Sequence, residues 1–504
     1  MAVQLDPERV AVTEFEGVSV TAGQLADLAR RAASRFETGT HVAYCAGNCL
    51  ALPVALFGSS IARRPFLPLN YRLSDEQLKT IVGTHDLVAV ADPANAERLR
   101  KAGCTAIIDN ATLVTPQAML GGSPEDADPD GVALLLYTSG TTAEPKGAIL
   151  RHRHLAAYVI ATVDFGAASS DEAALVSVPP YHVAGVMNLL TNLYAARRIV
   201  YLDRFDALRW LECVRAERVT QAMVVPTMLS RIVDLLDDAE ADTPSLRALA
   251  YGGARMPPHV LERALRAFSG AGFANAYGLT ETSSTIAVLG PDDHRTALTS
   301  RDPSLRARLR SVGKPVPGIE VQIRDASGGI ASTYEAGDIV VRGEQIAGEY
   351  LDDSTKESDW FATRDRGYLD ADGYLFIEGR ADDTIIRGGE NIAPAEIEDV
   401  LLQHGSVSDC AVVGIDDDEW GQRLAAAVVP GAGELVDVDD LREFAKARLR
   451  SAKTPDTVTV VETLPYTETG KLLRRVVREQ LQRRQADMGS ASPLEKGTHD
   501  ATRK

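Results

Sequence analysis

The chain has 504 residues, of which 45% are hydrophobic and 25% are charged. This length exceeds what one hydrophobic core usually supports, so we expect two or more domains. The composition is that of a globular protein and excludes wholesale disorder. The formal net charge of -18 at pH 7 disfavours nonspecific nucleic-acid binding, because such a surface repels phosphates.

The cysteines and the apolar runs indicate the cellular compartment of the protein. The five cysteines are odd in number and mostly far apart, which indicates reduced thiols and not a disulfide framework. Cys45 and Cys49 lack a second Cys/His pair at ligand spacing and predict no metal site. No apolar run reaches the length of about 18 residues that a transmembrane segment needs, and the N-terminus lacks signal-peptide features. We expect a cytoplasmic protein.

Helix-like and apolar runs alternate along the first three quarters of the chain. From Leu25 the runs LADLARRAASRF, HVAYCA and DLVAVAD predict βαβ units and parallel sheet. The run VALLLY at 132–137 predicts a buried strand. Later apolar runs end in glycine or a polar turn near residues 225, 252 and 278, the place where α/β sheets hold ligands.

The last quarter of the chain has a different pattern. EIEDVLLQHG, DCAVVGI, AAAVVP and LREFAKARLR predict a second compact module of helices and strands. The fold class is therefore α/β, with a large N-terminal domain of sheets layered with helices and a small α+β C-terminal domain. We expect the domains at 1–379 and 384–482, and a polar, disordered tail at 483–504.

Directly after VALLLY the chain reads YTSGTTAEPKG, residues 137–147. Gly140 and Gly147 allow close backbone approach, and Lys146 adds positive charge, so a polyphosphate would suit the segment. Its hydroxyl donors are Thr138, Ser139, Thr141 and Thr142. Because the segment is not the GxxxxGK[ST] nucleotide loop, its composition alone leaves a Ser/Thr-rich surface turn equally open.

The eleven residues resemble the phosphate loop of the acyl-adenylate-forming superfamily, which includes fatty acyl-CoA ligases, aryl-CoA ligases, luciferase and peptide-synthetase adenylation domains. The family loop reads YTSGTTGxPKG, and Ala143 replaces its second glycine. The other family motifs follow in order, and the resemblance runs from about residue 20 to 475. The chain is identified as a member of this superfamily, in which the small C-terminal domain is mobile.

The resemblance implies a nucleotide site. Tyr277 would stack on adenine, Thr280 would reach the phosphates, and Glu281 would help to hold Mg²⁺ together with Thr142. Asn275 would read the adenine amino group. The remaining adenine-side residues that the resemblance implies are Gly252, Gly253, Ala254, Ala276 and Gly278.

Further family motifs lie toward the C-terminus. Asp365 stands where a carboxylate binds the ribose hydroxyls, and Arg380 where an arginine meets ribose and phosphate. Arg364 replaces the usual glycine, although arginine resists the positive φ that glycine adopts. Lys471 would bridge the substrate carboxylate and the α-phosphate as negative charge develops.

The resemblance also implies two mobile elements. Asp382, within a hinge at 380–383, would be the point about which the C-terminal domain rotates. Gly388, Gly389 and Glu390 would form the channel for the thiol acceptor, where glycines let a thin pantetheine arm pass.

The segment PPYHVAG at 179–185 resembles the start of the family's acyl-pocket helix. The resemblance implies that His182 lines the path to the carboxylate and joins Lys471, Thr142 and Glu281 among the catalytic residues. The candidate lining residues are Val183, Val186, Met187, Met228, Met256, Ile286 and Val288. This apolar set favours a fatty acid. Arg231 could instead pair with a second carboxylate, as in malonyl-type ligases, although a surface-facing side chain is favoured.

These residues predict an enzyme that uses ATP and Mg²⁺ to convert a fatty acid into acyl-AMP, releases pyrophosphate, and transfers the acyl group to CoA. An acyl carrier protein delivers the same phosphopantetheine thiol and remains an alternative acceptor. A noncatalytic nucleotide-binding regulator would need a broken phosphate loop or a missing Lys471, and both are intact. A luciferase-like oxygenase would emit light with oxygen. We expect no nucleic-acid partner.

Overall fold

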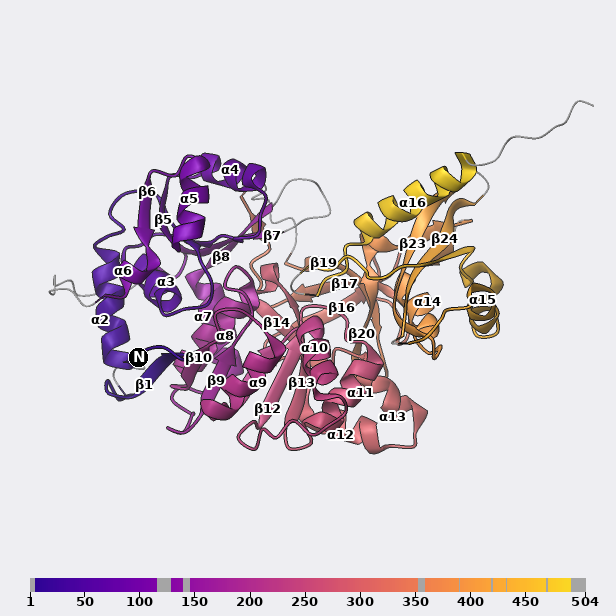
Figure 1. Cartoon of the computed structure of the whole chain (residues 1–504), viewed down its shortest axis with the longest axis horizontal. Helices are drawn as coiled ribbons and strands as arrows, with labels where there is room; N and C mark the ends of the chain where they lie inside the picture. The colour runs from indigo at the N-terminus through magenta and orange to yellow at the C-terminus, as the bar shows by residue number, and fades with distance from the viewer. Residues whose placement is uncertain are drawn as a thin grey trace, which may run out of the picture. The chain divides into compact units, whose positions relative to one another are not determined.

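The computed structural model describes residues 5–115, 128–138, 146–351, 359–388, 390–417, 420–431, 433–467 and 470–490. The chain forms two compact units. The larger comprises residues 1–363 and 367–377, and the smaller comprises residues 364–366 and 378–504. Their elements are labelled in Figure 1. Within the described residues, no helix has both the length and the apolar character needed to cross a membrane.

A nine-stranded sheet forms one half of the larger unit. Its middle strands run parallel, from β1 through β10, β9, β11 and β12 to β13, whereas the outer strands β2, β14 and β15 pair antiparallel. The strand order is β15 (Lys314–Pro315), β14 (Ser284–Leu289), β13 (Gly272–Leu279), β12 (Ala248–Gly252), β11 (Gln221–Val224), β9 (Ala173–Val176), β10 (Arg198–Tyr201), β1 (Val10–Glu14) and β2 (Ser19–Thr21).

A seven-stranded sheet forms the other half. Strands β7, β4, β3, β5 and β6 run parallel, and β8 and β18 pair antiparallel at the edge opposite β6. The strand order is β18 (Glu349–Tyr350), β8 (Lys146–Arg151), β7 (Val132–Thr138), β4 (Phe66–Pro68), β3 (His41–Cys45), β5 (Leu87–Ala91) and β6 (Ala106–Asp109). The buried strand predicted at 132–137 is thus confirmed as β7, with Leu134 fully buried.

Helices follow most of the parallel strands, as the alternating apolar runs predicted. They are α2 (Ala22–Ala33), α3 (Ala51–Ile61), α4 (Asp75–Thr84), α5 (Pro93–Lys101), α6 (Asn110–Leu113), α7 (His152–Thr162), α8 (Val183–Tyr194), α9 (Ala207–Ala216), α10 (Pro226–Leu236), α11 (Pro258–Ala267), α12 (Pro291–Thr299) and α13 (Pro303–Ala307), with 3-10 turns η1 (Thr280–Thr282) and η2 (Arg308–Arg310). Sequence-local caps start several of them: Thr21 and Gln24 form a capping box on α2, which satisfies two backbone donors.

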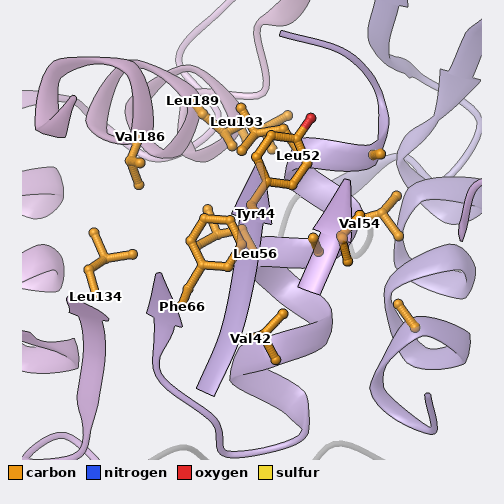
Figure 2. Packing of buried hydrophobic residues seen from close by; sticks show 14 of the residues in the cluster. Val42, Tyr44, Leu52, Val54, Leu56, Phe66, Leu134, Val186, Leu189 and Leu193 are labelled. Carbon is orange, nitrogen blue, oxygen red and sulfur yellow. The ribbon is translucent and has the colours of Figure 1, made fainter. Parts of the chain in front are cut away.

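The largest buried cluster contains side chains from both large sheets and from α3 and α8. Figure 2 shows its centre, where Leu189 and Leu193 of α8 lie near Tyr44 of β3 and Leu52 of α3. A second cluster joins α9, α10 and α11 to β11 and β12. The two clusters hold the strand ends that carry the predicted site.

A four-stranded sheet follows in the chain, in the order β16 (Glu320–Arg324), β17 (Gly337–Arg342), β19 (Phe361–Leu369) and β20 (Leu375–Arg380). The smaller unit is built on a three-stranded sheet, β23 (Val407–Asp417), β24 (Gly421–Pro430) and β25 (Thr457–Val460). Its other elements are η3 (Ala381–Asp383), β21 (Ile385–Arg387), β22 (Glu390–Ile392), α14 (Pro394–Leu401), α15 (Val438–Lys446), η4 (Ser451–Lys453) and α16 (Arg474–Ser490).

The architecture confirms the predicted fold class: a large N-terminal domain of sheets and helices followed by a smaller domain of mixed helix and sheet. One prediction about the C-terminus needs correction. Helix α16 continues to Ser490, into the segment that was expected to be a disordered tail from residue 483. Residues 491–504 lie outside the described part of the chain.

Candidate adenylation site

The phosphate loop connects two antiparallel strands. β7 ends at Thr138 and β8 begins at Lys146, and these two residues are paired across the strands. The loop therefore leaves and re-enters the seven-stranded sheet at one point. Lys146 is half-buried at the first position of β8. Ser139, Gly140, Thr141 and Thr142 lie outside the described residues, so their predicted roles at the phosphates and the metal stay predictions.

The adenine-side residues come together where β12 and β13 end. These strands are parallel neighbours, and Gly252 is paired with Ala276. A Cβ at Gly252 would lie 2.2 Å from the carbonyl oxygen of Ala276, and one at Gly278 would lie 1.7 Å from the carbonyl oxygen of Ser284. No side chain fits at either position, because backbone atoms of the neighbouring strand occupy the place of a Cβ. Asn275 donates from Nδ2 to the carbonyl of Ser311 at 3.3 Å.

The other predicted residues of this region lie on the same elements. Gly253 and Ala254 directly follow β12, and Tyr277 is half-buried on β13, packed against a buried cluster that includes Ile286. Thr280 opens η1, the turn that carries Glu281. The structure thus brings together at one edge of the nine-stranded sheet the residues that the sequence assigned to adenine.

Glu281 is half-buried and is held at both its side chain and its main chain. Tyr350 donates from Oη to Oε1 of Glu281 at 2.6 Å, and the Glu281 carbonyl accepts from the Ala347 amide at 2.9 Å. Just beyond it, Ser283 and Ser284 have φ values of +53° and +97°, which store backbone strain of the kind that clusters at functional sites. Sequence reasoning missed Tyr350, because it lies 69 positions away in the chain and no local pattern announces the contact.

A single carboxylate fits the metal chemistry that the family implies. Within the described residues, no group of three or more His, Cys, Asp or Glu side chains is placed to hold a metal ion. Mg²⁺ in nucleotide enzymes usually binds one or two carboxylates together with substrate phosphates and waters. Glu281, oriented by a hydrogen bond, is the kind of ligand that such a site uses.

His182 caps α8 and packs on the ring of Tyr181, with the ring centroids 4.6 Å apart. Tyr181 in turn makes an edge contact with Tyr71, at 5.2 Å between ring centroids. Burial lowers the pKa of His182 to about 4, so its imidazole is neutral at pH 7. It can hydrogen-bond a substrate, but it brings no positive charge to a carboxylate.

The predicted acyl pocket needs correction. Val186 and Met187 are 0% and 1% exposed and belong to the largest buried cluster, where Val186 points toward Leu134 and Phe66 (Figure 2). Met228 is 6% exposed within the second cluster. These residues form part of the core-facing stripes of α8 and α10. Other candidate residues, Met256 and Val288, are half-buried. Arg231 is exposed, the orientation that the sequence favoured.

In the smaller unit, Arg380 and Asp365 form an ion pair, with 3.0 Å between Nε and Oδ1. The two residues predicted at the ribose thus come together, and Asp365 is buried. Arg364, beside it, has φ +62°. The position therefore keeps the left-handed backbone for which the family uses glycine. For a residue other than glycine this conformation costs about 1–2 kcal/mol of free energy.

Residues in and beside the predicted hinge and acceptor channel form ion pairs and hydrogen bonds within the smaller unit. Asp382 is exposed in η3. Oδ2 of the next residue, Asp383, lies 3.5 Å from Nε of Arg474, and Nη2 of Arg474 donates to Oε2 of Glu398 at 2.9 Å. In the acceptor channel, Gly388 is exposed and donates its amide to the carbonyl of Trp420 at 2.8 Å. Gly389 lies outside the described residues, and the exposed Glu390 begins β22.

Lys471 is exposed, and its main chain is hydrogen-bonded to Thr467. Its amide donates to Oγ1 of Thr467 at 3.0 Å, and its carbonyl accepts from the Thr467 amide at 2.9 Å. Tyr466 ties the loop to β23 by donating to Oδ2 of Asp409 at 2.9 Å. Burial raises the pKa of Asp409 to about 6. Sequence reasoning missed this tyrosine–aspartate pair, since its members are 57 residues apart.

Comparison with known proteins agrees with this geometry. Residues 1–351 match the family of AMP-binding enzymes, and residues 396–471 match the C-terminal domain of AMP-binding enzymes. The chain is 33% identical to a feruloyl-CoA synthase of Amycolatopsis sp and 31% identical to a 2-succinylbenzoate–CoA ligase of Bacillus cereus, in each case over 94% of this chain and 96% of the relative.

Solved structures give the same picture. The o-succinylbenzoate CoA synthetase (MenE) of Bacillus subtilis, in complex with its acyl-adenylate intermediate, superposes with a TM-score of 0.82 at 28% identity, over 95% of this chain and 96% of that one. ATP-bound MatB from Rhodopseudomonas palustris gives 0.84 at 26% identity, over 95% and 98%. The chain belongs to the AMP-binding enzyme family, within the acyl-adenylate-forming superfamily.

Proposed function

We propose that this protein is an AMP-forming acid–thiol ligase that joins an aromatic carboxylic acid to CoA through an acyl-AMP intermediate. The observation that carries the proposal is that the ionic residues of the family site, Lys146, Glu281, Asp365, Arg380 and Lys471, are all present in this chain, which matches CoA ligases over 94% of its length. A noncatalytic regulator would not need all of these groups together.

In the first half-reaction a substrate carboxylate oxygen attacks the α-phosphorus of ATP, a P–O bond forms, and the bond to pyrophosphate breaks. Mg²⁺ bound to the nucleotide neutralises charge on the phosphates. Lys146 and Lys471 place positive charge where negative charge develops in the transition state. Glu281 holds the metal-bound nucleotide, and Tyr277 with the glycines of β12 and β13 binds adenine.

In the second half-reaction the acceptor thiol loses its proton, its sulfur attacks the acyl carbonyl, and AMP leaves. The family resemblance assigns Asp382 as the hinge for the domain rotation between the two steps. Gly388 lies beside the exposed indole of Trp420, and the resemblance assigns Gly388 and Gly389 to the channel through which the pantetheine arm enters. CoA is the proposed acceptor, because the relatives named above are CoA ligases.

The acid that we propose differs from the fatty acid expected from the sequence. Val186 and Met187 belong to the core, so part of the apolar surface on which that expectation rested is packed against other core residues. The relatives are named for ferulate, 2-succinylbenzoate and indoleacetate, acids that carry an aromatic ring. An aryl acid needs a compact, flat pocket. Met256 and Val288 are half-buried and offer apolar surface for such a pocket.

A product assay tests the proposal. Purified protein is incubated with ATP, Mg²⁺ and one acid from a panel of cinnamates, benzoates, arylacetates, octanoate, palmitate and malonate, first without an acceptor and then with CoA or a phosphopantetheinylated carrier protein. We expect pyrophosphate release with an aryl acid and a thioester of CoA. Lys471→Ala serves as the inactive control for the first step.

Each alternative predicts a different result. Octanoate or palmitate ahead of every aryl acid would restore the fatty-acid prediction, and malonate ahead of all others would favour a malonyl-type ligase. Thioester formed on the carrier protein but not on CoA would identify an acyl-AMP ligase that loads carrier proteins. Nucleotide binding without pyrophosphate release from any acid would refute the proposed activity.

A further inference from the structure

The residues that follow β17 contact two parts of the candidate site at once. We define residues 345–351 as the strap. All of its residues lie in the larger unit and within the described part of the chain. It contains Ala347 and Tyr350, which hold Glu281, and it has no role among the motifs that the resemblance supplied.

The first half of the strap is bonded to the turn that carries Glu281. Gln345 is 3% exposed and donates from Nε2 to the carbonyls of Thr282 and Thr285, each at 2.9 Å. Ser283 donates from Oγ to the Gln345 carbonyl at 2.8 Å. Buried polar groups that are mutually satisfied in this way hold one geometry. This network explains how the strained backbone at Ser283 persists.

The second half of the strap is bonded to the strand that leaves the phosphate loop. β18 pairs with β8, with Glu349 opposite Ile149 and Tyr350 opposite Ala148. The amide of Leu351 donates to the carbonyl of Gly147, next to Lys146, at 2.9 Å. Glu349 also pairs with Arg151 at 2.7 Å, and this arginine lowers the pKa of the Glu349 carboxyl. The strap is therefore fastened to β8 by main-chain and ionic contacts.

Tyr350 is the point at which the two attachments meet. Its main chain belongs to β18, which pairs with β8, and its hydroxyl donates to Oε1 of Glu281 at 2.6 Å. A hydrogen bond from a hydroxyl to a carboxylate at this length is of the strong, charge-assisted kind. It restricts rotation of the Glu281 carboxylate, because one of the two carboxylate oxygens is held by the hydroxyl. Residues of this type, which hold a metal ligand in position, often affect metal affinity strongly.

We propose that Tyr350 is a positioning residue for the metal–nucleotide complex: through the strap it holds the Glu281 carboxylate at a set position relative to the phosphate-loop strand. The proposal rests on the proposed function, because it takes Glu281 as the metal-binding carboxylate. It adds a residue to the site that neither the sequence motifs nor the resemblance assigned.

The test is the variant Tyr350→Phe, which keeps the ring and removes only the hydroxyl. Isothermal titration calorimetry measures the affinity of the full-length protein for α,β-methylene-ATP with Mn²⁺ and without any divalent ion. We expect the Mn²⁺ affinity of the protein–analogue complex to fall by about 10-fold, the lower end of the effect for such residues. Affinity for the analogue without a divalent ion should change less than about twofold, because the hydroxyl acts only through the metal ligand.

Tyr374→Phe is the matched control. Tyr374 lies in the same unit and donates from its hydroxyl to Oδ1 of Asp293 at 2.5 Å, a tyrosine–carboxylate bond of the same kind outside the candidate site. We expect this variant to leave both affinities unchanged. Glu281→Gln is the second comparison, since it replaces the charged carboxylate with a neutral amide and should weaken Mn²⁺ binding at least as much as Tyr350→Phe.

These variants separate failure of the inference from failure of the proposed function. Mn²⁺ affinity that falls in Glu281→Gln but stays within about twofold in Tyr350→Phe, well short of the expected effect, would overturn only the role of Tyr350. Unchanged Mn²⁺ affinity in Glu281→Gln would overturn both the metal role of Glu281 and this inference. Equal loss of nucleotide affinity with and without Mn²⁺ in Tyr350→Phe, or loss of its cooperative thermal unfolding, would show that the hydroxyl serves only the fold.

Discussion

Gly278→Ala is the change that tests most directly how closely the candidate site depends on backbone contact. Gly278 lies near the end of β13, where the register with β14 shifts. A Cβ added there would lie 1.7 Å from the Ser284 carbonyl oxygen and 2.9 Å from Cα of Thr285. Both neighbours are backbone atoms of β14, so no side chain can turn away to make room.

The geometry gives the magnitude of the expected effect. A carbon and an oxygen cannot approach closer than about 3 Å without severe repulsion, so β13 and β14 must separate locally by more than about an ångström. Overpacking of this kind costs about 1–3 kcal/mol of stability. Tyr277 and Glu281 flank the displaced segment on either side, and a misplacement of about 1 Å can lower a rate about 10²-fold. We therefore expect kcat/KM for adenylation to fall by at least about 10²-fold.

ATP–pyrophosphate exchange with the preferred acid measures the rate, and thermal unfolding measures the stability. Gly270→Ala is the matched control, because a Cβ at Gly270 has no atom within 4 Å and should change neither quantity. The reasoning would be refuted if Gly278→Ala retained exchange activity within about threefold of the wild type, well short of the 10²-fold loss expected from misplacement. A variant that lost activity together with its cooperative unfolding transition would report only the loss of the fold.

Three further changes test individual residues. Lys471→Ala should lower pyrophosphate exchange by about 10²-fold while supplied acyl-AMP is still converted to thioester, and full exchange would contradict its role. Arg364→Gly should be more stable to urea than Arg364→Ala by about 0.5–1 kcal/mol, because φ at this position is +62° and glycine avoids the left-handed penalty. The greater unfolded-state entropy of glycine offsets part of this gain. Equal stability of the two variants would contradict this account of the backbone. Asp409 has its pKa raised from 3.8 to about 6, so its contribution to stability is complete below pH 4 and is lost as pH rises through 6. Relative to Asp409→Asn, the wild type should lose up to about 3 kcal/mol between pH 4 and 7, and a pH-independent difference in urea denaturation would count against that shift.

The sequence alone grouped several of the candidate site residues, because they lie in short contiguous motifs. Tyr277, Gly278 and Glu281 lie within five consecutive positions, and the structure places them on one strand and the turn that follows it. The alternation of apolar and helical runs predicted the α/β class, because hydrophobic periodicity is a local property of each element. The replacement of the family glycine by Arg364 argued against a positive φ at this position, and only the structure shows that the positive φ is kept.

Only the tertiary structure could decide which apolar face of a helix is core and which faces a ligand. The apolar character of Val186, Met187 and Met228 suits a pocket lining as well as a helix stripe that packs against a sheet. The structure buries all three side chains. The contacts of Tyr350 with Glu281 and of Tyr466 with Asp409 join residues 69 and 57 positions apart. Such pairs produce no periodic pattern in the sequence, because they form only when separate segments of the chain come together in the folded protein. They can therefore be identified only from the tertiary structure.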